Sequence, residues 1–311
     1  MKVFESLEQI GQIDETVVAL GNFDGVHLGH QKIIERTVRS ANAMGLKSAV
    51  FTFSNHPSSV LGKGEPVKNI LYNEEKVHII EKMGVDYLIN IPFTRDILSM
   101  PPEQFVKDIL VDHLRIREAY CGFNYTFGYK ASGTPEVLMH EGLQHGFGIH
   151  VQEPFTIDGI VVSSTHIRQL ISEGRMEEVA KFMGRMYSVG GDVIIGNQLG
   201  RTIGFPTMNQ TIDDTMVTPP NGVYITYCTL EGVRYPSITN VGNKPTVGDF
   251  GKNIETHVFN FNEEVYGKHI HVEFVRRTRP EKKFGSVEEL QKQIQSDCIA
   301  AKAWHRERAM L

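Results

Sequence analysis

The chain has 311 residues, of which 41% are apolar and 22% charged, and its formal net charge is −5. This length exceeds one comfortable hydrophobic core and suggests two domains, while the acidic balance gives no overall field that favours nucleic acid or anionic membranes. The chain shows neither a signal peptide nor an apolar stretch of the roughly 20 residues that span a bilayer. The widely separated Cys121, Cys228 and Cys298 fit neither a disulfide framework nor a zinc site. We therefore expect a soluble cytoplasmic protein.

A short apolar run, Thr16–Leu20, predicts a buried strand that leads into the segment Gly21-Asn-Phe-Asp-Gly-Val-His-Leu-Gly-His30. A helix is expected over residues 29–44, so that His27 and His30 face one point at its start. Backbone N–H groups and the helix dipole favour anions there, and bound phosphates would stabilise the cationic imidazoles. The loop therefore predicts a phosphate site rather than a metal site. An ordinary Asp-Gly turn followed by a common His-x-x-His pair is the alternative.

The rest of the first 185 residues alternates strand-like and helix-like runs. The expected strands cover residues 48–53, 87–91, 119–122 and 149–151, and the expected helices cover 74–83, 102–114 and 137–145. This alternation is typical of a doubly wound parallel sheet in an α/β domain. Ligands bind such sheets beyond the carboxyl ends of the strands, where the loop of residues 21–30 falls.

A second anion site is predicted by the segment Val162-Ser-Ser-Thr-His-Ile-Arg168, which follows an expected strand and opens a helix. Arg168 can bind a phosphate through two parallel hydrogen bonds, and hydroxyl groups at a helix start can add donors. The alternative is that Ser164 or Thr165 caps the helix and Arg168 is solvated. Two anion sites in one α/β domain favour a nucleoside triphosphate ligand.

After Gly184 the sequence consists of short strands separated by turns, which suggests a small β-barrel. The expected strands cover residues 188–195, 222–230, 235–241, 254–261 and 269–274. A closing helix is indicated by a capping box of Ser286 and Glu289 and by a stripe of apolar residues at helical spacing. That stripe consists of Val287, Leu290, Ile294, Ala301 and Trp304. We predict domains over residues 1–184 and 185–311.

In the predicted barrel, the run from Gly196 to Asn209 is rich in glycine and ends in Pro206-Thr-Met-Asn209. The hydroxyl of Thr207 and the amide of Asn209 are oxygen ligands that suit Mg²⁺ bound to phosphates. A glycine-rich hairpin without a ligand is the alternative.

Glu255 is the candidate general base of this domain. If residues 254–261 form a strand, Glu255, His257, Phe259 and Phe261 share one face. Partial burial beside aromatic rings raises the pKa of a carboxyl group, and this would make Glu255 a better base for a hydroxyl. The alternative is an edge-strand glutamate at the rim of the barrel.

The two anion-site segments resemble the nucleotidylyltransferase superfamily and, more narrowly, the prokaryotic bifunctional FAD synthetases (riboflavin kinase/FMN adenylyltransferase). Two further segments, Thr52-Phe-Ser-Asn-His-Pro57 and Cys121-Gly-Phe-Asn-Tyr-Thr-Phe-Gly128, stand where that family has its flavin motifs. Pro206-Thr-Met-Asn209, Glu255-Thr-His257 and Arg279-Pro-Glu-Lys-Lys-Phe284 match the kinase half. The resemblance implies a Rossmann-like nucleotidylyltransferase domain followed by a riboflavin-kinase β-barrel with a C-terminal helix.

The resemblance also implies roles for individual residues. In the first domain, ATP contacts are implied for Gly21, Asn22, Phe23, His27, His30, Ser164, Thr165 and Arg168, and FMN contacts for His56, Pro57, Asn124 and Phe127. In the barrel, Gly200 is implied to contact ATP, Thr207 and Asn209 to bind Mg²⁺ and ATP, Glu255 to activate the riboflavin 5′-hydroxyl, and Arg279 to lie near the flavin.

The implied activity is a pair of consecutive reactions on small-molecule substrates. The barrel phosphorylates riboflavin to FMN, and the first domain adenylylates FMN to FAD and releases pyrophosphate, with His27 and His30 stabilising the α-phosphate. An enzyme like the aminoacyl-tRNA synthetases would share the histidine loop but needs a Lys-Met-Ser-Lys-Ser loop, which this sequence lacks. A flavin- or nucleotide-binding regulator without turnover remains an alternative.

Overall fold

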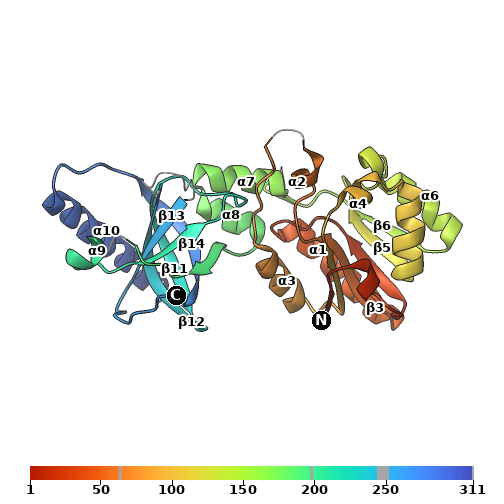
Figure 1. Ribbon diagram of the computed structural model, residues 1–311, viewed down its shortest axis with the longest axis horizontal. Helices are drawn as coiled ribbons and strands as arrows, with labels where there is room; N and C mark the ends of the chain where they lie inside the picture. The colour runs from red at the N-terminus through yellow and green to blue at the C-terminus, as the bar shows by residue number, and fades with distance from the viewer. Residues whose placement is uncertain (63–64, 197–198, 244–251, 310–311) are drawn as a thin grey trace. The chain divides into compact units, whose positions relative to one another are not determined.

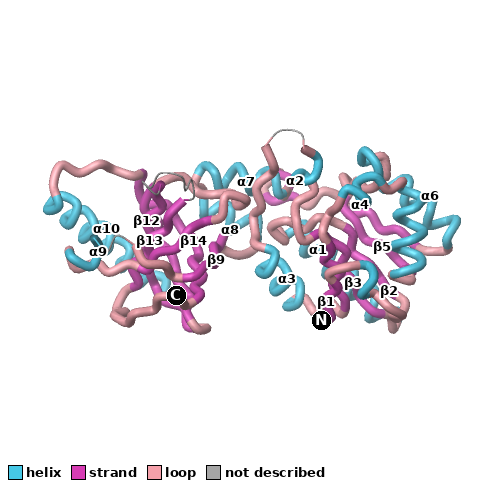
Figure 2. The backbone as a smooth tube through the Cα atoms, viewed as in Figure 1, coloured by secondary structure: helices cyan, strands magenta, loops and turns pink. Residues whose placement is uncertain are grey.

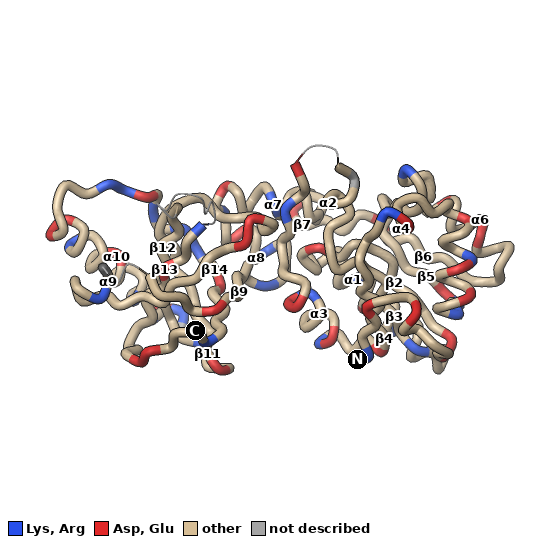
Figure 3. The backbone as a smooth tube through the Cα atoms, viewed as in Figure 1, with Lys and Arg blue, Asp and Glu red and all other residues tan. Residues whose placement is uncertain are grey.

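The computed structural model describes residues 1–62, 65–196, 199–243 and 252–309. The chain forms two compact units, Met1–Ser164 and Thr165–Leu311 (Figure 1). Acidic and basic residues are interspersed along both units (Figure 3), in keeping with the small net charge of −5. None of the described helices combines the length and the apolar character that crossing a membrane requires.

The first unit is built on a parallel sheet with the strand order β1-β4-β3-β2-β5-β6 (Figure 2). All its pairings run parallel. The strands are β1 Lys2–Phe4, β2 Thr16–Leu20, β3 Lys47–Phe53, β4 Tyr87–Ile91, β5 Ile116–Gly122 and β6 Gly148–Gln152, and a separate hairpin joins β7 Thr156–Ile157 to β8 Ile160–Val161. Every residue of β2 is buried, as expected for a central parallel strand. The predicted parallel sheet is confirmed.

The helices of the first unit alternate with its strands along the chain. They are α1 Leu28–Met44, α2 Ser58–Leu61, α3 Asn73–Lys82, α4 Arg95–Ser99, α5 Pro102–Gln104 and α6 Pro135–His145, with a π-helix over Phe105–His113 and short 3₁₀ turns at Leu7–Gln9 and Tyr129–Ala131. In α1 the buried positions Ile33, Ile34, Thr37 and Ala41 lie on one face, and Gly45 ends the helix in the left-handed conformation at φ 68°.

The strand order places β2 between β3 and β5, so the order reverses at β2. Because the strands are parallel, the segments that leave β3, β2 and β5 emerge at the same edge of the sheet. These three exits lead into His56 and Pro57, into the loop of residues 21–30, and into Asn124, respectively. Sequence segments that lie between residues 21 and 124 thereby meet at one edge of the sheet.

The second unit holds an antiparallel sheet with the order β10-β13-β12-β11-β14-β9, which curls into a nearly closed barrel. Its strands are β9 Tyr187–Asp192, β10 Met208–Ile212, β11 Gly222–Leu230, β12 Val233–Asn243, β13 Lys252–Val258 and β14 His269–Pro280, and its helices are α7 Ser164–Glu173, α8 Met176–Met183, α9 Leu199–Thr202 and α10 Val287–Ala309. The two end strands approach each other where the N–H of Ile194 donates to the carbonyl oxygen of Asn209 at 2.8 Å. The predicted barrel is confirmed.

The closing helix α10 packs on the outside of the barrel. Its Ile294, Cys298, Ala301 and Trp304 contact a cluster that contains Val223, Ile225, Ile238, Phe259 and Val275. Ser286 caps the helix as predicted, because the N–H of Glu289 donates to Ser286 Oγ at 3.2 Å, while the Glu289 carboxylate accepts from the N–H of Gly285 at 3.0 Å. Val287 is 51% exposed and does not join this cluster, so the predicted apolar stripe is too long at its first turn.

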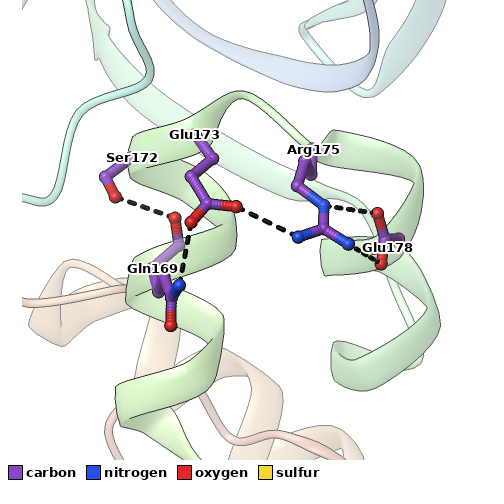
Figure 4. A network of polar contacts seen from close by, with 5 residues as sticks. All are labelled: Gln169, Ser172, Glu173, Arg175 and Glu178. Atoms are coloured by element: carbon purple, nitrogen blue, oxygen red, sulfur yellow. Dashed lines mark hydrogen bonds and ion pairs between the residues drawn. The ribbon is translucent and has the colours of Figure 1, made fainter.

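The turn between α7 and α8 is held by exposed polar side chains (Figure 4). The Arg175 guanidinium donates to both carboxylate oxygens of Glu178 at 2.6 Å and to Glu173 at 3.1 Å, and Gln169 donates to Glu173 at 2.8 Å. Such exposed pairs contribute little each, and the buried face of α8 gives most of the stability of this segment. The compact units divide between Ser164 and Thr165, after the first residue of α7, whereas the sequence predicts a boundary after α8, at Gly184.

Candidate active sites

The loop between β2 and α1 has an unusual backbone. Phe23 and Val26 have φ values of 49° and 36°, and Gly25 between them has φ 83°. A β-branched residue such as Val26 rarely adopts a positive φ, and backbone strain of this kind concentrates at functional sites. The Gln31 side chain donates to the carbonyl oxygen of Val26 at 2.8 Å, which holds the strained residue in place. The sequence motif therefore encodes a particular backbone path as well as two histidines.

His27 caps α1 with its own ring. Its Nδ1 accepts a hydrogen bond from the backbone N–H of His30 at 3.1 Å, and the two imidazoles stack with centroids 3.5 Å apart. A ring that accepts at Nδ1 carries its proton at Nε2. The two histidines lie together at the helix start, as the sequence predicts, and the Nε2 atom of His27 is available as a donor.

Buried contacts anchor the loop to its surroundings. The carboxylate of Asp24 accepts two hydrogen bonds from the N–H of Ile70, at 2.9 and 3.2 Å, and the Thr52 hydroxyl donates to the carbonyl oxygen of Asn22 at 2.8 Å. A Cβ added to Gly21 would lie 3.0 Å from the ring of Phe23, so the loop path leaves little room at the strand exit. Gly21, Asn22 and Phe23, predicted to contact ATP, thus lie in a tightly packed turn.

Ser164 is the residue through which the start of α7 reaches this loop. Its hydroxyl donates to the carbonyl oxygen of Asp24 at 2.9 Å rather than capping α7, so the structure disfavours the capping alternative for Ser164. Thr165 is exposed and Arg168 is half-buried in the first turn of the same helix. Their predicted ATP contacts stay predictions.

The residues predicted to contact flavin in the first unit differ in their surroundings. His56 and Pro57 are half-buried, and His56 Nδ1 lies 2.8 Å from the Ser58 hydroxyl. Asn124 is exposed at the end of β5. Phe127 is only 7% exposed and belongs to the hydrophobic core. Three of the four predicted residues are therefore accessible, whereas Phe127 offers little surface to a ligand.

The barrel contains a cavity of about 350 Å³ at the predicted Mg²⁺ and ATP site. Its lining includes Thr207, Asn209, Thr256 and Glu263. The Asn209 amide donates to Thr207 Oγ1 at 3.3 Å, which brings the two predicted metal ligands together. The described residues hold no group of three or more His, Cys, Asp or Glu side chains that could bind a metal. Two oxygen donors suit Mg²⁺, which keeps most of its coordination for waters and substrate phosphates.

Glu255 lies beside this cavity without lining it. On β13 it pairs in register with Asn209 of β10 and Asn240 of β12, while its neighbour Thr256 lines the cavity. Glu255 is half-buried, and its carboxylate accepts from the Asn253 amide at 3.0 Å. Burial raises the pKa of Glu255, and the Asn253 hydrogen bond opposes that shift only partly, so the predicted direction is confirmed.

Two other predicted barrel residues have clear structural roles. A Cβ on Gly200 would clash with the carbonyl oxygen of Phe205, so this position requires glycine. Arg279 binds Asp297 of α10, with Nε and the terminal NH2 group donating to its carboxylate at 2.7 to 3.1 Å. The Arg279 guanidinium therefore holds α10 against β14. Sequence reasoning missed Asp297, Asn253 and Gln31, since none of them stands out without its spatial partner.

Stacked histidines at the switch point of a parallel sheet, together with a barrel cavity whose lining includes Thr207 and Asn209, indicate a class of protein with two places suited to nucleotide phosphates. The FAD synthetase family model matches residues 10–166, and the riboflavin kinase family model matches residues 183–305.

Relatives cover nearly the whole chain. The bifunctional riboflavin kinase/FMN adenylyltransferase of Bacillus subtilis is 37% identical over 91% of this chain and 90% of its own length. The enzymes of the same name from Haemophilus influenzae (34%, covering 92% and 93%) and Escherichia coli (30%, covering 97% and 97%) are similar. The chain belongs to the bifunctional riboflavin kinase/FMN adenylyltransferase family.

A solved structure supports the complete fold. A Streptococcus pneumoniae crystal structure, described as a macrolide-efflux protein, matches with a TM-score of 0.88 and 29% identity and covers 97% of this chain and 98% of that one. The likeness extends through both units of the chain.

Proposed function

We propose that this chain carries out both reactions of its family: riboflavin phosphorylation in the barrel and FMN adenylylation in the first unit. The observation that supports this most directly is the stacked His27–His30 pair at the start of α1, at the switch point of the sheet. The raised pKa of the half-buried Glu255 supports the other reaction independently.

In the adenylylation step, an FMN phosphate oxygen attacks the α-phosphorus of ATP, and the bond from that phosphorus to the bridging oxygen breaks to release pyrophosphate. The attacking phosphate is already anionic, so the step needs no strong base. His27 donates from Nε2, because its Nδ1 accepts from the N–H of His30. The two imidazoles and the start of α1 stabilise the charge that builds on the α-phosphate. Ser164, whose hydroxyl donates to the carbonyl oxygen of Asp24 in the histidine loop, binds the triphosphate.

In the kinase step, the riboflavin 5′-hydroxyl attacks the γ-phosphorus of ATP while its proton passes to Glu255, and ADP leaves. The raised pKa of Glu255 makes it a stronger base than an exposed glutamate. Thr207 and Asn209 would hold Mg²⁺, which neutralises phosphate charge when it is bound. Because Glu255 of β13 pairs in register with Asn209 of β10, the base lies next to the strand that carries the proposed Mg²⁺ ligand.

Two single variants test this division. His30→Ala should stop FAD formation and leave FMN formation intact, and Glu255→Ala should stop FMN formation yet still convert supplied FMN to FAD. Each protein is mixed with Mg²⁺-ATP and riboflavin or FMN, and the flavins are separated by chromatography. A folded variant that lost both activities would contradict the two-site proposal. Riboflavin bound but unchanged by the unmutated protein would favour a flavin-binding regulator.

The proposal also covers the cellular location of the enzyme, its partners and its domain boundary. We place the enzyme in the cytoplasm, because Cys121, Cys228 and Cys298 are buried free thiols and suit a reducing compartment. With a net charge of −5 and interspersed charges, we expect no nucleic-acid partner. We keep the domain boundary at Gly184, and limited proteolysis with mass analysis of the fragments would test it.

A further inference from the structure

Lys76 is a buried lysine at the ligand edge of the parallel sheet that no motif points to. It lies in α3 and is 7% exposed, although lysine is rarely buried without a partner. Its ammonium donates to the carbonyl oxygen of Phe53, the last residue of β3. Phe53 leads directly into Ser54, Asn55, His56 and Pro57. Lys76 therefore holds the strand exit that precedes the predicted flavin residues.

The segment after Phe53 is fixed at further points. The N–H of Ser54 donates to the carbonyl oxygen of Ile91 at 2.9 Å. The Asn55 side chain accepts from the N–H of Phe93 at 2.7 Å and donates to its carbonyl oxygen at 3.3 Å. Lys76 thus contributes the first of several contacts that fix the path from β3 to His56, and its contact brings a positive charge to this strand exit.

Lys76 also interacts electrostatically with the histidine loop. Asp24, from the histidine loop, is 6% exposed and is the charged group that acts on Lys76. Burial lowers the pKa of Lys76 from 10.5 to about 8, and the negative charge of Asp24 opposes that shift. The charged form of Lys76 therefore prevails below about pH 8 and adds a favourable interaction with Asp24, which the neutral form lacks.

We propose that charged Lys76 is a positioning residue for adenylyl transfer, holding the flavin-side exit of β3 and the Asp24 turn of the histidine loop in one arrangement. The inference rests on the proposed FMN adenylylation. The in-line attack requires the FMN phosphate and the α-phosphate of ATP to be aligned, and small misplacements of reacting groups cost large factors in rate. Loss of the charge disturbs both halves of the site together.

The pH dependence separates this role from simple stabilisation. The rate of adenylylation should fall as the pH rises above about 8, since Lys76 then loses its proton. Stability should change in the opposite direction. Because the folded protein binds this proton less tightly than the unfolded chain does, the Lys76 contribution to stability improves between pH 8 and 10.5. Falling activity without unfolding is therefore the expected signature.

The experiment compares Lys76→Met, Lys76→Arg and the unmutated protein in FMN adenylylation from pH 6.5 to 9.5, a window of about three units around the pKa of Lys76. Lys76→Met should lower kcat about 10²-fold, with a smaller change in the KM for FMN. Lys76→Arg should retain activity at neutral pH and lose the alkaline decline, because arginine stays charged throughout. Riboflavin phosphorylation, measured on the same samples, should keep its rate.

Lys82→Met, an exposed lysine at the end of the same helix, is the matched control and should behave like the unmutated protein. An alkaline decline that persists in Lys76→Arg, or a normal kcat in Lys76→Met, would overturn the proposal. If Lys76→Met fails to fold, the pH profile of Lys76→Arg still decides. Absence of FAD formation by the unmutated protein would instead refute the proposed function.

Discussion

The two candidate sites are built in opposite ways. The histidine site of the first unit comes mainly from one continuous segment, in which His27 caps the helix that carries His30. The barrel site is assembled from separate strands, where Asn209 of β10 pairs with Glu255 of β13 and Arg279 of β14 binds α10. A site that one continuous segment forms can therefore be recognised from local sequence, whereas a site that strand register forms depends on the whole barrel.

The largest expected effect separates the two roles of His27. His27→Asn should lower FMN adenylylation about 10²–10³-fold, because the imidazole donor is lost. Asparagine is a good N-cap, so the free energy of unfolding should stay nearly unchanged. Steady-state rates and chemical denaturation measure the two quantities.

His27→Ala provides the comparison for the same position. It removes the cap as well and should cost about 1 kcal/mol of stability in addition to the lost rate. A normal adenylylation rate in His27→Asn would show that the imidazole serves only as a helix cap. The proposed catalytic role of His27 would then be wrong.

The next effect tests how far the barrel depends on a distant contact. Asp297→Ala breaks the bidentate pair with Arg279. The Asp297 side chain is 10% exposed and the Arg279 side chain is 21% exposed. We expect the barrel to lose about 2 kcal/mol, because a mostly buried charge is left without its partner. Trp304 on α10 is the single tryptophan of the chain, so its fluorescence during denaturation reports on this unit.

The control for that experiment is Asp192→Ala, which breaks an exposed pair with His269 and should change stability by less than about 1 kcal/mol. FMN adenylylation should be unaffected by either variant. Equal stability of the two variants would mean that α10 is held by its apolar face alone.

The smallest effect concerns the pH dependence of the barrel site. Glu255 can accept a proton only when it is ionised, so riboflavin phosphorylation should decline toward acidic pH, at higher pH than for an exposed glutamate. Asn253→Ala removes the hydrogen bond that stabilises the carboxylate and should move this decline further upward. The adenylylation profile should not move. A kinase profile that is the same in both proteins would argue against Glu255 as the base.

Sequence reasoning located most regular elements but missed those without a strong local pattern. The edge strand Lys2–Phe4 is too short to show alternation. Strand Met208–Ile212 follows a glycine- and proline-rich run that resembles a loop. The helix predicted over residues 102–114 is one α-helical turn followed by a π-helix, because apolar periodicity does not distinguish these hydrogen-bond patterns.

The candidate site residues likewise fall into those that a local sequence pattern reveals and those that it does not. His27 and His30 were predicted together and lie together, since they are three residues apart on one helix start. Phe127 matched a motif, yet the tertiary structure buries it in the core. Lys76 was overlooked, because a lysine in an amphipathic helix is normally solvated and only its packing reveals burial.

The amino-acid sequence by itself determined the strand–loop–helix of the histidine site, the division into an α/β and a β part, and the family. These depend on backbone preferences, helix capping and hydrophobic period, which act over a few residues. The tertiary structure alone decided the strand order that gathers three exits at one edge, the register that sets Glu255 beside Asn209, and the burial of Lys76. These features arise from pairing and packing between segments far apart in the chain, which local preferences do not encode.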